Sequence, residues 1–141
     1  MNSPRRFPLL ATCTLLLAAC ASDPMKLPPG GRADLLPIKD YPQIVATRGL
    51  DQWLAFSPAY VDPSTDLSPL RVTVPVRSLY DKGQLRIQYR FEFFDERGLP
   101  VGPAPGYRFA VLEPRIQNNY LEGNAMETTA VDWRLEVRPA R

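Results

Sequence analysis

The chain has 141 residues with 17 basic and 15 acidic side chains, 16 prolines, two cysteines and no histidine. Without histidine, the Ser-His-Asp and Cys-His nucleophile systems and every histidine-containing zinc site are excluded, and with them most enzyme mechanisms. Arg5 and Arg6 lie in a segment that we expect to be cleaved, and without them 15 basic residues balance the 15 acidic ones. A neutral mature chain offers no electrostatic footprint for nucleic acid.

The N-terminal segment has the organisation of an export signal. Arg5 and Arg6 precede an apolar run, Leu9 to Ala19, of about ten residues, which is too short for a bilayer core that needs roughly 20. The run ends in Leu17-Ala18-Ala19-Cys20, which resembles the lipobox of bacterial lipoproteins. We therefore expect residues 1–19 to be a signal helix cleaved by a dedicated signal peptidase that recognises Leu17, Ala18 and Ala19. The alternative is a short apolar helix that happens to end in a cysteine.

Cys20 is the expected lipidation site, carrying acyl chains such as palmitate, and no cofactor is expected. Cys13 leaves with the signal, so the folded domain has neither a disulfide nor a free thiol. Ala21 follows Cys20, and in enteric-type sorting an aspartate there retains a lipoprotein at the inner membrane. The resemblance to that system therefore implies the outer membrane, facing the periplasm, rather than the inner membrane.

Composition divides the mature chain into a tether and one domain. Residues 21–42 hold five prolines and the tetrad Pro28-Pro29-Gly30-Gly31, and no apolar period persists. We interpret residues 20–42 as a lipidated, flexible tether whose distal Leu35, Leu36 and Ile38 dock on the domain. The domain is expected to span residues 43–141.

The domain shows alternating apolar and polar residues over short stretches, which is typical of strands. Pro75 cannot donate to a ladder, so its strand has a free edge or a bulge there. Asp95–Gly98 is a predicted turn with Gly98 at positive φ. About seven strands with almost no helical period predict an all-β sandwich or barrel. The expected strands are Ile44–Ala46, Trp53–Tyr60 interrupted by Pro58, 71–77, 85–93, 106–112, 120–125 and 131–137.

Several side chains are candidates for a catalytic, partner-binding or metal-binding site. Glu92 and Asp95 leave a strand end on opposite faces, so we interpret them as a surface residue and a turn residue rather than a catalytic pair. Arg90 faces outward, and we expect it to pair across strands with Glu136 or its neighbours. Phe94 also points away from the core face, where the loop at 99–105 covers it or a partner binds it. Trp53 and Trp133 are expected core anchors, and no metal site is expected.

Three stretches together resemble the YcfL-like family of small bacterial lipoproteins: residues 74–78 (VPVRS), residues 89–98 (YRFEFFDERG) and residues 130–138 (AVDWRLEVR). Ser78 stands where many relatives have asparagine. The resemblance implies an immunoglobulin-like β-sandwich facing the periplasm and no enzymatic activity. Relatives are sometimes encoded beside a lipoprotein activator of peptidoglycan synthases, which implies a link to cell-wall synthesis.

Two functions follow as hypotheses. The first is a non-catalytic envelope lipoprotein that binds another protein, for example through an added strand, with Phe94 and Arg90 on the partner surface. The second is a carbohydrate- or peptidoglycan-binding module that uses exposed aromatic rings. A free strand edge or flat apolar patch favours the first hypothesis, and a concave face with two exposed rings favours the second.

Overall fold

The computed structural model describes residues 34–114 and 118–140. The expected signal peptide with Leu17, Ala18 and Ala19, the lipidation site Cys20 and the tether up to residue 33 lie outside the described residues, so they stay predictions. Within the described part, no helix is long and apolar enough to cross a membrane.

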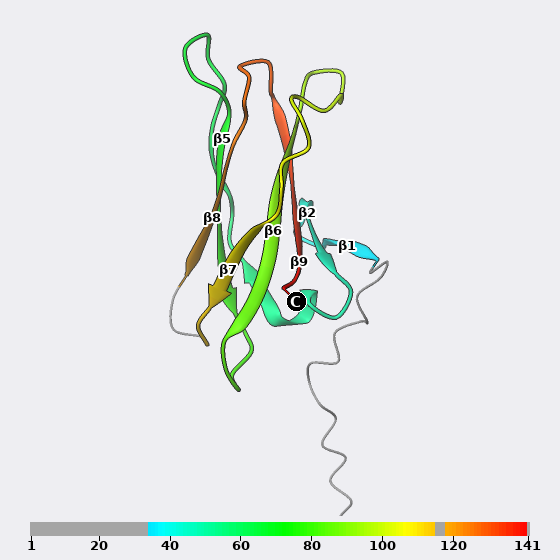
Figure 1. Ribbon diagram of the computed structural model, residues 1–141, viewed down its shortest axis with the longest axis vertical. Coiled ribbons are helices and arrows are strands. Elements are labelled where there is room, and N and C mark those ends of the chain that lie inside the picture. Colours follow the sequence, from blue (N-terminus) through cyan, green and yellow to red (C-terminus); the bar gives the residue numbers. More distant parts are fainter. Residues whose placement is uncertain (1–33, 115–117, 141) are drawn as a thin grey trace, which may run out of the picture.

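In the part of the chain that the structure describes, nine strands form two packed sheets, and one short 3-10 turn connects two of the strands (Figure 1). One sheet has the order β1-β2-β9-β6-β7. In the other, β3 and β4 pair with one side of β5, and β8 pairs with the other side. The elements are β1 (Leu35–Ile38), β2 (Tyr41–Thr47), η1 (Asp51–Trp53), β3 (Leu54–Phe56), β4 (Tyr60–Asp62), β5 (Arg71–Ser78), β6 (Leu85–Phe94), β7 (Arg108–Leu112), β8 (Asn119–Asn124) and β9 (Asp132–Pro139).

The connections are those of an immunoglobulin-like sandwich, as expected. The orders β3/β4-β5-β8 and β7-β6-β9 match strands A-B-E and C′-C-F of that fold. The position of the last strand, G, is occupied by β2, which runs parallel to β9. The described residues form nine strands instead of about seven because one expected strand is divided into β3 and β4, and because β1 is an additional strand.

Strand β1 corrects the expected boundary between tether and domain. β1 and the start of β2 lie inside residues 20–42, which the sequence assigned to the tether. The two strands pair antiparallel, and Leu35, Leu36 and Ile38 are half-buried, so their expected docking is confirmed. The prolines in this segment argued against a strand. β1 is an edge strand, however, and an edge strand tolerates Pro37, because a proline there does not remove a hydrogen bond to a second neighbouring strand.

Pro75 lies opposite a bulge, which confirms the prediction made from its missing N–H. Phe56 pairs with Val76 and Tyr60 pairs with Thr73, so three residues of the β3–β4 connection face two residues of β5. The Ser57 amide donates to the Pro75 carbonyl at 3.1 Å. The irregular partner strand therefore accommodates a residue that cannot donate.

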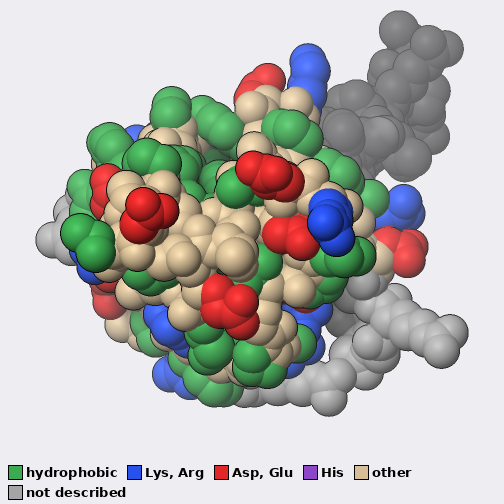
Figure 2. All heavy atoms as spheres, turned by 90° about the horizontal axis from the view of Figure 1, so that it is seen from above, with side chains coloured by type: hydrophobic (Ala, Val, Ile, Leu, Met, Phe, Trp, Pro, Cys, Tyr) green, Lys and Arg blue, Asp and Glu red, His purple; other side chains and the backbone are tan. Residues whose placement is uncertain are grey.

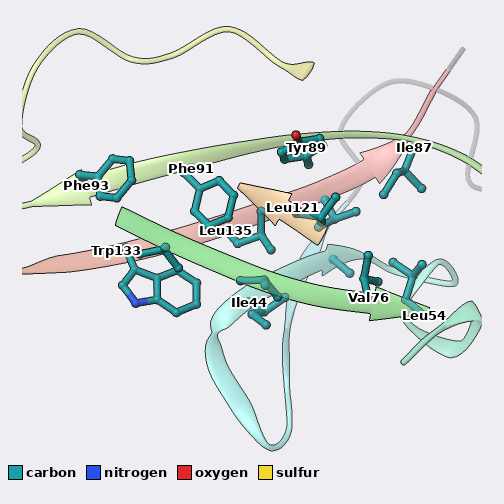
Figure 3. Packing of buried hydrophobic residues seen from close by; sticks show 14 of the residues in the cluster. Ile44, Leu54, Val76, Ile87, Tyr89, Phe91, Phe93, Leu121, Trp133 and Leu135 are labelled. Atoms are coloured by element: carbon teal, nitrogen blue, oxygen red, sulfur yellow. The ribbon is translucent and has the colours of Figure 1, made fainter. Parts of the chain in front are cut away.

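The core lies between the sheets and follows the alternation in β6, whose Leu85, Ile87, Tyr89, Phe91 and Phe93 are all buried. Figure 3 shows the rings of Phe91, Phe93 and Trp133 beside one another. Phe91 lies 6.2 Å from Phe93 and 6.0 Å from Trp133, measured between ring centroids. Trp133 is thus a core anchor as expected. Trp53 is half-buried, packs against the core and meets Tyr80 edge to face at 5.6 Å.

The turn after β6 forms as predicted. Gly98 has a φ of 74°, and its amide donates to the Asp95 carbonyl at 2.9 Å. The Asp95 carboxylate accepts hydrogen bonds from the amides of Arg97 and Leu99, both at 2.9 Å. Asp95 therefore has a structural role in the turn and forms no carboxylate pair with Glu92.

Candidate functional site

Arg90 is the centre of an ion-pair and hydrogen-bond network on the outer face of the five-stranded sheet. Its Nε and Nη2 donate to Glu136 Oε2 at 2.7 and 2.6 Å, and its Nη2 lies 2.9 Å from Glu92 Oε1. The predicted pairing of Arg90 with Glu136 is confirmed. Tyr107 donates its hydroxyl to Glu136 Oε1 at 2.5 Å, and the Arg138 guanidinium lies 3.4 Å from the centroid of the Tyr107 ring. We call these five residues the Arg90 network.

The electrostatics of the network favour a structural role. Glu136 is only 8% exposed, and its charge is balanced by Arg90. Burial raises the pKa of Tyr107, and the hydrogen bond to Glu136 raises it further, to about 12. Burial lowers the pKa of Arg90, but the hydrogen bond and charge of Glu136 outweigh this effect and raise it overall. Both shifts are upward, so neither Tyr107 nor Arg90 exchanges a proton near neutral pH.

The raised pKa of Tyr107 predicts a loss of stability in alkali. An unfolded tyrosine ionises near pH 10, whereas folded Tyr107 ionises near pH 12. The contribution of Tyr107 to the free energy of unfolding is therefore fully present below pH 10 and is lost as the pH rises toward 12. We expect the stability difference between the wild type and Tyr107→Phe to shrink over this interval, as followed by denaturant melts. An ultraviolet titration in which Tyr107 ionises together with an exposed tyrosine would contradict this prediction.

Phe94, the other residue assigned to a partner surface, is half-buried. Its backbone is paired on both sides, with Pro100 through an isolated bridge and with Asp132 at the start of β9. The Val131 amide donates to the Phe94 carbonyl at 2.8 Å. The loop after β6 thus folds back beside Phe94, which follows Arg90 and Glu92 in the same outward-facing row of β6.

The strand β7 presents a surface that the alternation pattern of the sequence did not indicate. Within residues 34–114 and 118–140, β7 has a neighbouring strand, β6, on one side only. Phe109 is 69% exposed, and Val111 is exposed as well. The register places Phe109 opposite Gln88 and Val111 opposite Arg86, so both apolar side chains lie on the outer face of the sheet. Gln88 also pairs with Arg138 of β9, so Phe109, Gln88 and Arg138 lie side by side across three strands. We call Phe109, Val111, Arg86 and Arg138 the β7 surface.

A small pocket opens at the side of the sandwich between the edges of β7 and β8. Its volume is about 90 Å³, and its lining includes Phe91, Phe93, Pro103, Pro105 and Met126. It is smaller than a 150 Å³ cavity that holds benzene, so it has room for a single aliphatic side chain rather than a sugar. Beside the pocket, Arg108 links β7 to β8, since its Nη1 donates to the Glu122 carbonyl of β8 at 3.1 Å.

Two exposed tyrosines lie on the outer face of the other sheet. Tyr60 pairs with Thr73, and Tyr120 pairs with Pro75 from the opposite side of β5. Both rings are exposed. The two rings project from the same outer face, two strands apart, so the sheet separates them by roughly 10 Å or more.

The fold and these surfaces define a β-sandwich in which the described residues show neither a catalytic constellation nor a group of three His, Cys, Asp or Glu residues able to hold a metal ion. The chain belongs to the family described as "Protein of unknown function (DUF1425)", whose model matches residues 43–139. None of the curated proteins matches the chain.

Two solved structures share the fold. The crystal structure of Campylobacter jejuni cj0090 is 19% identical with a TM-score of 0.58, and the match covers 70% of this chain and 98% of that one. The crystal structure of a DUF1425 family member from Shewanella sp. pv-4 is 22% identical with a TM-score of 0.53, and the match covers 62% of this chain and 79% of that one. At these identities the likeness concerns the fold alone.

Proposed function

We propose that the chain is a non-catalytic cell-envelope lipoprotein whose sandwich binds another protein through the β7 surface. The observation that carries the proposal is the free edge of β7 with the exposed Phe109 and Val111 beside it. The finer identity, a YcfL-like lipoprotein anchored through Cys20 in the outer membrane and linked to cell-wall synthesis, belongs to the same proposal. It is supported by the lipobox residues, Ala21 and the sequence resemblance.

An edge strand has backbone N–H and C=O groups that no neighbouring strand pairs with. Such an edge is usually protected by lysine, proline or a bulge, because it can pair with a further strand. β7 contains neither lysine nor proline, and its ladder with β6 is regular over five residue pairs. An added strand would gain main-chain hydrogen bonds and contacts with Phe109 and Val111. Arg86 and Arg138 beside them favour a partner strand that carries carboxylates.

The tether sets where this surface can act. With β1 beginning at Leu35, about 15 residues separate Cys20 from the domain, and they reach on the order of 45 Å when fully extended. A domain held at this distance from the membrane can meet periplasmic proteins and the domains of other envelope proteins.

The alternative function is a carbohydrate- or peptidoglycan-binding module, and Tyr60 and Tyr120 are the observation in its favour. Exposed rings can stack on sugars, and these two lie on one face. On the same face, Thr73 of β5 lies between the two flanking strands, and Glu122 is the next outward residue after Tyr120 on β8, so both offer hydrogen-bonding groups near the rings. We rank this function second because it rests on two exposed rings alone, whereas β7 combines exposed apolar side chains with an edge strand.

The test places a photo-crosslinking amino acid at Phe109 in the full chain, in living cells. We expect a protein adduct that Val111→Lys diminishes about tenfold, since a lysine on the free edge opposes strand addition. The matched control carries the crosslinker at Tyr120. A glycan adduct from Tyr120 together with no adduct from Phe109 would replace the proposed function by the alternative one.

A further inference from the structure

Three loops meet at one end of the sandwich, away from β1 and from the C-terminal end of β9 (Figure 1). They connect β4 to β5 (residues 63–70), β6 to β7 (residues 95–107) and β8 to β9 (residues 125–131). We call this end the loop end. Loops carried at one end of a rigid sandwich are the usual place for recognition in this architecture.

The loop end exposes an unusual share of the large apolar side chains. Leu67 is 97% exposed and Met126 is 71% exposed, and Leu99 and Val131 are exposed as well. These four are nearly half of the nine exposed large hydrophobic residues in the described part of the chain. They come from all three loops, so the apolar character belongs to the surface and not to a single loop. Exposed apolar groups gathered in this way mark an interaction site.

The net charge of the loop end indicates the charge of a complementary partner. The three loops contain four acidic residues, Asp66, Asp95, Glu96 and Glu127, and one basic residue, Arg97. Asp132 adds a carboxylate at the start of β9, whereas Asp62 lies opposite the basic Arg71 in the register of β4 and β5. Figure 2 looks onto this end and shows acidic and apolar side chains interspersed, with most basic side chains toward the rim.

The loops are held in place before any partner arrives. The Ser64 hydroxyl donates to the Thr128 carbonyl and so joins the β4–β5 loop to the β8–β9 loop. Thr65 and Ser68 pair through both backbone and side chains, and their hydroxyl oxygens lie 2.9 Å apart. Asp95 fixes the third loop through its turn hydrogen bonds. Because the loops are already ordered, binding loses little conformational entropy.

We propose that the loop end is a docking surface for a protein partner that is basic and presents apolar side chains between its positive charges. Acidic loops repel anionic lipid headgroups and the carboxylates of peptidoglycan, which leaves a positively charged protein as the complementary occupant. This surface is separate from the β7 surface, so the inference goes beyond the proposed function and stands or falls independently of it.

The experiment uses the full chain in living cells with a photo-crosslinking amino acid at Leu67 or, separately, at Met126. A matched control carries it at Gln52, which is exposed on η1 at the opposite end. We expect the same protein adduct from both loop positions and none from Gln52. In the double variant Asp66→Lys with Glu127→Lys the adduct should fall about tenfold, whereas Lys82→Glu should leave it unchanged.

The crosslinked segment of the partner is then identified by mass spectrometry, and the proposal requires it to carry a net positive charge. Both charge variants lie on exposed positions, so their melts should match the wild type within about 0.5 kcal/mol. The proposal is overturned by a lipid or glycan adduct, by an acidic partner segment, by equal labelling from Gln52, by a yield that charge reversal leaves unchanged, or by no adduct at either loop position. None of these results alters the test at Phe109.

Discussion

Replacing Phe91 by alanine is expected to destabilise the domain by about 3–5 kcal/mol, a large part of the 5–15 kcal/mol that holds a typical domain folded. Phe91 is 4% exposed and lies between the two sheets, where its ring contacts Phe93 and Trp133. Its truncation removes buried apolar area and leaves a cavity that close neighbours in β8 and β9 cannot fill. Denaturant melts of the two proteins measure the difference.

The neighbouring Arg90→Ala variant is the control for the opposite face of β6. Alternation alone predicts a cost well under 1 kcal/mol for an outward-facing residue. The structure raises the expected cost to about 1–3 kcal/mol, because Glu136 is buried and would lose its charged partner. A loss at Arg90 as large as that at Phe91 would contradict the assignment of the two faces.

Gly123→Ala is the second substitution expected to have a large effect. Gly123 lies in β8 and faces the core, and a Cβ built there would lie 2.4 Å from Phe91 Cγ and 2.8 Å from Phe91 Cβ. Both atoms lie close to the Phe91 backbone, so a rotamer change cannot move them away as it could move the end of a flexible side chain. Either the ring or the strand must move, so we expect a loss of about 1–3 kcal/mol or more.

Gly106→Ala is the matched control, because a Cβ at Gly106 meets nothing within 4 Å and its backbone needs no positive φ. It should be neutral or raise stability by up to about 1 kcal/mol through the entropy of the unfolded chain. Thermal and denaturant melts of both alanine variants compare the two sites. Equal effects at Gly123 and Gly106 would mean that β8 and β6 do not approach as closely as the structure has them.

The sequence predicted the parts of the fold that alternation controls. β6 and β9 have one apolar face each, so the burial of Phe91 and Trp133 followed from a period of two. Val131, expected at the start of the last strand, lies before β9 and is exposed. β1 could not be predicted in this way, since its four residues contain a proline and become a strand only through pairing with β2. The division of one expected strand into β3 and β4 also depends on a long-range partner, namely β5 and its Pro75.

The candidate surfaces were less predictable. Pairing of Arg90 with Glu136 could be expected from facing strands, but Tyr107 joins the network from a loop that no periodicity positions. The β7 surface left a signal in the sequence, because Phe109-Ala110-Val111-Leu112 is apolar on both faces of a strand. Which of those faces stays open depends on the order of strands in the sheet. The loop end joins residues more than 60 positions apart, which only the fold brings together.

The central claim, a sandwich held at a membrane through a lipidated Cys20, is tested most directly by mass spectrometry of the mature N-terminal peptide from detergent-extracted membranes. We expect a peptide that begins at Cys20 and carries acyl chains, found with outer-membrane markers on a sucrose gradient. The Cys20→Ser variant should accumulate as an unprocessed, unlipidated precursor. An unmodified N-terminus in the soluble fraction, or a Cys20→Ser variant that is still cleaved at residue 20 and released, would contradict the claim.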